Sequence, residues 1–121
     1  MKAKIADLWI KALRSGDYKQ GRGQLEDNKG RFCCLGVLCD LAIKDGVKIN
    51  REIGHYNNLF TYDTNTGSLP DKVMKWSGLK TSDGTYKYYS DTIRALWRHN
   101  DEGRMSFEEI ADIIEENRTR L

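Results

Sequence analysis

The stretch from Arg31 to Ala42 constrains this chain most, because it is the longest apolar run and contains all three cysteines. As a helix, it places five apolar side chains on one face at the spacing of a buried stripe: Cys34, Val37, Leu38, Leu41 and Ala42. Leu35, Cys39 and Ile43 fall on an adjacent face, so the helix is apolar over most of its circumference. The sequence therefore predicts a central helix that other elements cover on several sides.

Gly36 lies inside this predicted helix, where a glycine costs about 1 kcal/mol relative to alanine. Its presence indicates that another backbone passes close to the helix at this point. Gly46, which follows Lys44 and Asp45, is a suitable C-terminal end for the helix.

The length of 121 residues fits one domain, residues 1–121, which is large enough to bury a hydrophobic core. With a net charge of +2 and 10% aromatic residues, the composition implies neither a disordered tail nor a strongly basic nucleic-acid module. Specific binding of DNA or RNA is therefore not expected. No apolar run approaches the roughly 20 residues of a membrane span, and the amino terminus lacks a signal-peptide core. We expect no membrane association and a cytoplasmic location.

The three cysteines, Cys33, Cys34 and Cys39, lie within seven residues and cannot all pair with one another. Two thiols on one helix face are also poorly placed for a disulfide. The Cys-Cys-x4-Cys spacing, with no histidine three to five residues further on, does not match the usual structural zinc sites. We therefore expect buried, reduced thiols, no metal site and no cofactor.

Two further helices are predicted at the ends of the chain. The last one has Ser106 as N-cap and Glu109 three residues later, which is the signature of a capping box. The segment from Asp17 to Gly30 is polar and rich in glycine, and is predicted to be a loop or a weak hairpin with a turn at its end. The first helix should pack on the central helix through an apolar stripe that ends at Ser15-Gly16: Ile5, Leu8, Trp9, Ala12 and Leu13.

Patterns of period 2 follow the central helix. Leu59 to Tyr62 and Thr85 to Tyr89 are predicted to be strands, with a short helix after Pro70 between them. These two strands should form a small antiparallel sheet. Ser90-Asp91 is predicted to start a helical segment with the apolar residues Ile93, Leu96 and Trp97. We expect an α+β fold in which amino-terminal, central and carboxy-terminal helices pack with this sheet.

Aromatic residues in this part of the chain outnumber the positions on one core face of two short strands. They are Tyr56, Phe60, Tyr62, Tyr86, Tyr88 and Tyr89. Packing within the sheet is the favoured explanation for these residues. Any that remain accessible suit a protein interface or stacking on a nucleobase.

Four motifs stand out in the chain. They are Trp9 to Gln20 (W-x-x-A-L-R-S-G-x-Y-x-Q), Phe32 to Ala42 (F/Y-C-C-L-G-V-L-C-D-L-A), Asn100 to Gly103 (N-D-x-G) and Ser106 to Glu115 (S/T-F-x-E-I-A-D-x-I-E). In these four motifs the chain resembles a family of small phage and prophage proteins of uncharacterised function. The resemblance implies an accessory role in a host cell and carries no activity with it.

The loop before the central helix contains a candidate anion-binding site. The side chains of Lys19, Arg22 and Arg31 supply positive charge, and the glycines around Arg22 would let backbone N–H groups approach an anion. A small anion would settle where such a loop faces the amino terminus of the central helix. A solvated basic loop is the alternative. With the Asn-Asp pair of the shared motif added, the candidate ligand site is Lys19, Gln20, Arg22, Gln24, Arg31, Asn100 and Asp101.

A cysteine hydrolase is a second hypothesis, because a thiol at the amino terminus of a helix has its thiolate stabilised by the helix dipole. The residues typical of the papain-like cysteine are absent from this sequence, which favours buried and inert thiols. The hydrolase would use Cys33 or Cys34 as nucleophile, His55 or His99 as base, and Gln20 or Gln24 as oxyanion donor.

We therefore expect a protein that acts by binding and not by catalysis. Its expected partner is a small anionic or nucleotide-like ligand, or a host protein such as a defence component, in the cytoplasm of the host cell. The cysteine-dependent hydrolase is the alternative function. A homo-oligomer stays compatible with the sequence.

Overall fold

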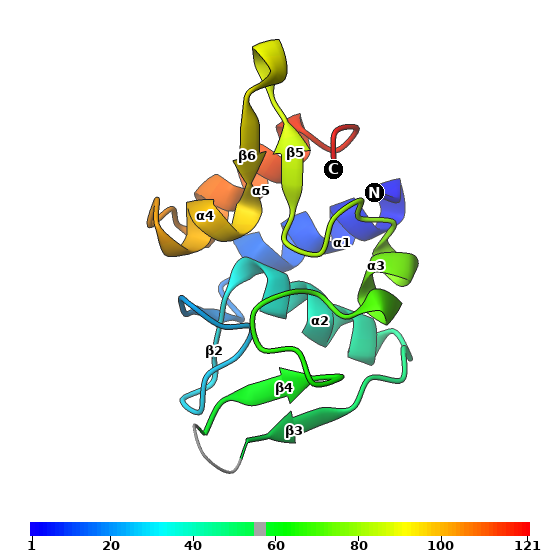
Figure 1. Cartoon of the computed structure of the whole chain (residues 1–121), viewed down its shortest axis with the longest axis vertical. Helices are drawn as coiled ribbons and strands as arrows, with labels where there is room; N and C mark the ends of the chain where they lie inside the picture. The colour runs from blue at the N-terminus through cyan, green and yellow to red at the C-terminus, as the bar shows by residue number, and fades with distance from the viewer. Residues whose placement is uncertain (55–57) are drawn as a thin grey trace.

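The central helix is present as α2 (Cys34–Lys44) in the computed structural model, which describes residues 1–54 and 58–121 (Figure 1). The predicted helices at the two ends are α1 (Ala3–Arg14) and α5 (Phe107–Glu116). Three short helical segments complete this part of the structure: α3 (Asp71–Ser77), the 3-10 helix η1 (Tyr89–Asp91) and α4 (Leu96–Asp101). The predicted capping box at the start of α5 is confirmed, with Ser106 and Glu109 bonding reciprocally.

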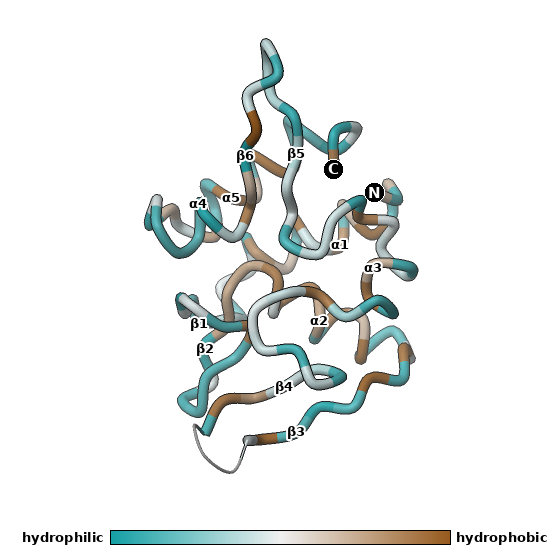
Figure 2. The backbone as a smooth tube through the Cα atoms, in the orientation of Figure 1, coloured by the Kyte–Doolittle hydropathy of each residue, from teal (hydrophilic) through white to brown (hydrophobic). Residues whose placement is uncertain are grey.

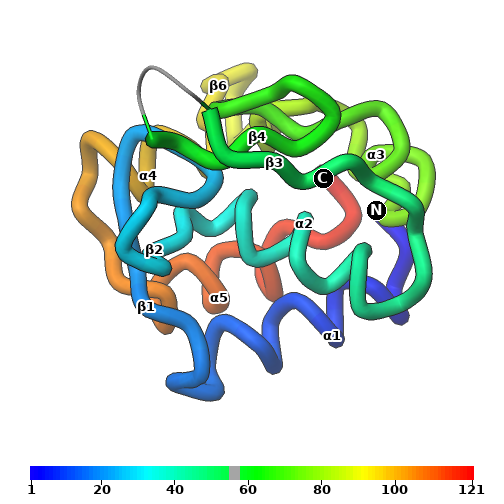
Figure 3. The backbone as a smooth tube through the Cα atoms, turned by 90° about the horizontal axis from the view of Figure 1, so that it is seen from below, coloured from blue at the N-terminus to red at the C-terminus, as the bar shows by residue number. Residues whose placement is uncertain are grey.

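Helix α2 lies in the middle of the molecule, between the α1–α5 pair and the β3–β4 hairpin (Arg51–Ile53 and Phe60–Tyr62; Figure 3). Figure 2 shows a concentration of hydrophobic residues along α2. Its first six residues, from Cys34 to Cys39, are all buried, as predicted for a covered helix. The packing of α1 on α2 is also confirmed, because Trp9 Nε1 donates a hydrogen bond of 2.9 Å to Cys34 O.

The predicted close approach at Gly36 is confirmed. A Cβ atom at Gly36 would lie 1.8 Å from the carbonyl oxygen of Leu25, in the loop before α2. Only a residue without a side chain fits at this crossing.

The polar segment before α2 is a loop with a short pairing at its ends. Strand β1 (Lys19–Gln20) pairs in parallel with β2 (Arg31–Phe32). The turn predicted at the end of the segment is present, because Asp27 Oδ1 accepts hydrogen bonds from the backbone N–H groups of Lys29 (2.8 Å) and Arg31 (2.9 Å).

The two predicted strands exist, but the prediction that they pair with each other is wrong. Strand β4 (Phe60–Tyr62) pairs antiparallel with β3 (Arg51–Ile53), and β5 (Thr85–Lys87) pairs antiparallel with β6 (Ile93–Ala95). Each strand therefore forms a hairpin with a segment close to it in the sequence. The two hairpins lie at opposite ends of the molecule (Figure 1).

The helical segment predicted from Ser90-Asp91 is also wrong in its first half. Ser90 and Asp91 have positive φ values of 54° and 61°, and the chain reverses direction there. Ile93–Ala95 then returns as strand β6, and the helix begins only at Leu96.

Among the described residues, the structure has no helix long and apolar enough to cross a membrane.

The crossing at Gly36 leads to a stability prediction. In an open helix, Gly36→Ala would stabilise the protein by about 1 kcal/mol through helix propensity. Because the new methyl group would overlap Leu25 O, we expect it instead to destabilise by about 1–3 kcal/mol or more. Urea unfolding measures the difference. Gly67→Ala is the matched control, because a Cβ there meets nothing within 4 Å, and it should change stability little. Equal effects of the two variants would contradict the close crossing.

Candidate functional site

The structure brings three of the predicted ligand residues together, Gln20, Asn100 and Asp101. Asn100 is fully buried, and its Oδ1 accepts hydrogen bonds from Gln20 Nε2 (2.9 Å) and from the backbone N–H of Cys34 (3.3 Å). Its Nδ2 donates to Gly21 O (2.9 Å) and to Asp101 Oδ1 (2.8 Å). This amide therefore joins the loop, the start of α2 and the end of α4.

The amino terminus of α2, where the sequence predicts a bound anion, is occupied by side-chain atoms of Asn100 and Cys33. The N–H of Cys34 points to Asn100 Oδ1, and the N–H of Gly36 donates to Cys33 Sγ at 3.4 Å. The side-chain oxygen and sulfur atoms thus serve as the caps of the helix.

In the described part of the chain the other predicted ligand side chains do not join this cluster, although Lys19 and Arg31 are register partners in the β1–β2 pair. Arg31 Nε pairs with Asp27 Oδ2 at 2.5 Å, and Gln24 is half-buried. Lys19 and Arg22 are exposed, and within the described chain no hydrogen bond or ion pair connects their side chains to the cluster.

The three thiols are buried, as predicted. Burial raises the pKa of Cys33 to about 11 and raises the pKa of Cys34 and of Cys39 well above its ordinary value. Cys34 Sγ also lies 3.7 Å from Leu96 O, to which the thiol donates. The environment therefore favours the protonated thiol over the nucleophilic thiolate.

The histidines proposed as bases lie in different situations. His99 is half-buried, and its Nε2 lies 3.1 Å from the hydroxyl of Tyr86. Burial, followed by the charge of Arg94, lowers the pKa of His99. His55 lies outside the described residues. Across residues 1–54 and 58–121, no three His, Cys, Asp or Glu side chains are grouped so as to hold a metal ion.

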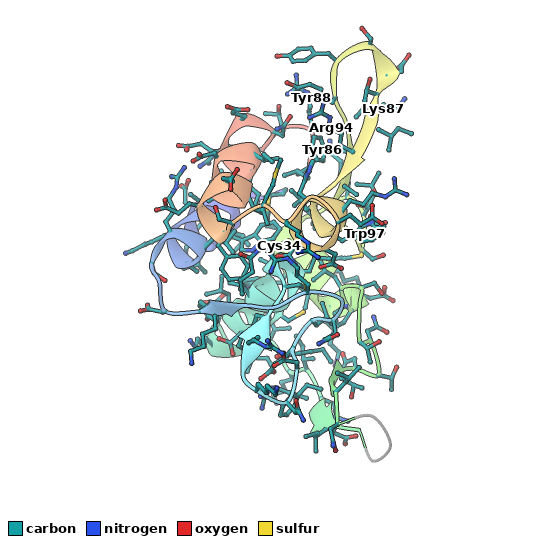
Figure 4. All side chains as sticks on the ribbon, turned by 90° about the vertical axis from the view of Figure 1, so that its left-hand side faces the viewer. Cys34, Tyr86, Lys87, Tyr88, Arg94 and Trp97 are labelled. Carbon is teal, nitrogen blue, oxygen red and sulfur yellow. The ribbon has the colours of Figure 1, made fainter. Side chains whose placement is uncertain are left out.

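The β5–β6 hairpin offers a different candidate surface, because it projects from the helices (Figure 1). Its base is fixed: Tyr86 is buried, and the backbone N–H of Leu96 donates to Gly84 O at 3.1 Å. Tyr86 and Arg94 face each other in the register, and they lie with Tyr88 on the side toward α5 (Figure 4). Trp97 lies at the base of the hairpin (Figure 4).

Arginine–tyrosine contacts hold the tip of the hairpin. The guanidinium of Arg94 lies 4.3 Å from the ring centre of Tyr88. The guanidinium of Arg120, from the C-terminal turn, lies 5.0 Å from the ring of Tyr89 and 5.9 Å from that of Tyr88. Such contacts stabilise by about 0.5–1 kcal/mol each at exposed sites. Cationic side chains from two chain segments thus contact the tyrosines of the tip.

The same hairpin exposes large apolar side chains. Ile93 is 67% exposed and Tyr89 is 65% exposed, more than the other exposed large hydrophobic residues of the described chain. A hollow of about 490 Å³ and another of about 290 Å³ flank the hairpin, and Thr85 and Ile93 line both. The sequence predicts accessible tyrosines in this region but not an exposed Ile93, because the apolar spacing places this residue in a helix. The strand signal was the alternation of Ile93, Arg94 and Ala95 after the Ser90-Asp91 turn.

The fold and this surface define a small α+β protein with a helical core and a projecting aromatic and basic hairpin. The chain belongs to a family described as Domain of unknown function (DUF8296), whose model matches residues 1–118. Comparison with curated proteins found no match. Comparison with solved structures found none either.

The buried amide cluster predicts a large effect of Asn100→Ala on stability. The change leaves the N–H of Cys34 and the oxygen of Gly21 without this partner, and each buried unpaired group costs about 1–3 kcal/mol. We expect a loss of about 3 kcal/mol in urea unfolding. Arg22→Ala, in the exposed part of the same loop, should stay within about 0.5 kcal/mol of wild type. A small effect of Asn100→Ala would show that the amide does not hold these segments together.

The raised thiol pKa values predict a pH profile. Native protein should resist alkylation by iodoacetamide near pH 8.5, where free cysteine is about half thiolate, whereas urea-unfolded protein should react at all three thiols. The unfolded chain loses thiol protons above about pH 8.5 and the native Cys33 only near its pKa of about 11. Stability should therefore fall between these values. Mass spectrometry of the alkylated protein checks the first point, and rapid native labelling of Cys33 or Cys34 would support the hydrolase.

Proposed function

We propose that this protein acts by binding a partner protein through the β5–β6 hairpin. The observation that carries the proposal is the exposure of Ile93 and Tyr89 on a projecting hairpin that also presents arginines. Tyrosine, tryptophan and arginine dominate the energetics of protein interfaces, and exposed apolar residues rimmed by polar groups mark interaction sites.

The anchored base of the hairpin favours tight recognition. Tyr86 of β5 and Ala95 of β6 are buried, and the guanidinium groups of Arg94 and Arg120 contact the tyrosine rings of the tip. A surface that is already ordered loses less conformational entropy when a partner binds.

The partner in this proposal is a host protein, for example a component of host defence, met in the host cytoplasm. This part of the proposal rests on the resemblance to phage and prophage proteins, which is an argument from family context. The burial of all three thiols supports binding over the alternative, a hydrolase that uses Cys33 or Cys34 with His55 or His99.

The two hairpins provide a matched pair of variants. Ile93 in β6 and Ile53 in β3 are both exposed isoleucines, at 67% and 51%, so an aspartate at either position should leave folding nearly unchanged. Ile93→Asp should weaken binding by more than about 30-fold, the effect of losing about 2 kcal/mol at an interface centre, and Ile53→Asp should not.

In-cell cross-linking followed by mass spectrometry identifies the partner in bacterial host cells, and titration with the purified partner gives the affinities. Loss of the partner with Ile53→Asp but not with Ile93→Asp would move the interface to the β3–β4 hairpin. Equal binding by both variants and wild type would refute the hairpin as the binding surface.

A further inference from the structure

The larger hollow beside the β5–β6 hairpin is built from two stretches that are distant in the sequence, residues 80–93 and the C-terminal turn. Lys80 follows α3, Lys87 belongs to β5, and Arg120 lies in the C-terminal turn. The hollow measures about 490 Å³, within the range of small-molecule sites. It is separate from the loop that carries Lys19, Arg22 and Arg31.

The side chains that line this hollow carry net positive charge. A carboxylate outside the lining, Glu116, lies near enough to Tyr86 to add to the rise in pKa that burial causes there. Three of its lining side chains are cationic, and none is an aspartate or glutamate. No carboxylate of the described chain lies within ion-pair distance of Lys80 or Arg120. Lys87 has only Asp91, at 3.9 Å, and this aspartate is 92% exposed, so the pair is weak. Like charges gathered around one cavity repel one another, and an anion would relieve the repulsion.

The cationic side chains from outside the hairpin are held in position. Lys80 Nζ donates to Thr119 O at 3.1 Å, and Arg120 Nη1 donates to Asn117 Oδ1 at 2.9 Å. Neither bond neutralises a charge, because both acceptors are uncharged oxygens. The two side chains therefore keep their positive charge in these positions.

The wall of the hollow combines hydroxyl and apolar groups. Thr81 Oγ1 accepts from the N–H of Thr85 at 2.7 Å and donates to Thr85 O at 3.2 Å, which fixes the two threonines together. Tyr86 and Ile93 supply apolar surface. A bare inorganic anion would leave this surface and most of the volume unused.

We propose that this hollow binds a phosphate-bearing small molecule of nucleotide size. A phosphate monoester carries nearly two negative charges at neutral pH, which complements three cations better than a single carboxylate does. The apolar wall would receive the uncharged body of the ligand. This proposal does not rest on the protein-binding function proposed above, because ligand binding in the hollow requires no partner protein.

Nuclear magnetic resonance titration of the whole protein tests the site directly. The probes are adenosine monophosphate, inorganic phosphate and acetate. We expect saturable shifts of the amide signals of Thr81, Thr85, Lys87 and Thr119. Adenosine monophosphate should bind most tightly, inorganic phosphate less tightly and acetate most weakly. Shifts centred on Arg22 instead would place the anion in the loop, and no saturable shift at millimolar probe would overturn the proposal.

Matched charge removals complete the test. Arg120→Gln should weaken binding of adenosine monophosphate by about 10-fold or more, the loss of one charge-assisted hydrogen bond. Lys87→Gln should also weaken it, and since Lys87 is exposed this variant does not threaten the fold. Arg22→Gln removes the same charge elsewhere and should leave affinity unchanged. An equal effect of Arg22→Gln and Arg120→Gln would show general attraction to a positive protein, and would refute a site in the hollow.

Discussion

The crossing of the Leu25 backbone over Gly36 is the contact on which the arrangement of this molecule depends. At this crossing the polar loop packs directly against α2. Glu26, the residue after Leu25, is buried as a result. Arg51 donates two hydrogen bonds to the Glu26 carboxylate, at 2.8 and 2.6 Å, and the hydroxyl of Tyr62 donates a third at 2.5 Å. A buried carboxylate with these partners is expensive to separate from them. The β3–β4 hairpin is therefore attached to the core through the loop.

The β5–β6 hairpin is attached in a different way, and this difference is why it is the better candidate for function. Its base packs on the core through Tyr86 and Leu96, but its tip is ordered by Arg94 and Arg120 on tyrosine rings. Arg51 of the first hairpin neutralises a buried carboxylate, whereas no carboxylate of the described chain pairs with Arg94 or Arg120. Positive charge and exposed apolar surface thus remain available for other molecules.

The sequence predicted the helices well, because a period of 3.6 residues and the caps are local signals. The helix predicted from Ser90 onward was wrong up to Ala95. Ser90 and Asp91 have positive φ values and form the turn of a hairpin, which the spacing of apolar residues does not reveal. The sequence also grouped Gln20, Asn100 and Asp101 as ligand residues. The structure does bring them together, but with bonds to one another and to the backbone of Gly21 and Cys34. An amide that would bind a ligand and an amide that caps a buried helix look the same in a sequence.

The two proposed sites share residues, which couples them if both are used. Lys87 and Ile93 line the hollow beside β5 and belong to the hairpin surface offered to a partner protein. A ligand in the hollow would screen Lys87 and cover part of Ile93, so it would change the affinity of the hairpin for a partner. By linkage, the partner must then change the affinity of the hollow for the ligand by the same factor. The sign depends on the partner: an acidic partner that needs Lys87 competes with the phosphate, whereas one that covers only Tyr89 and Arg94 leaves the hollow open.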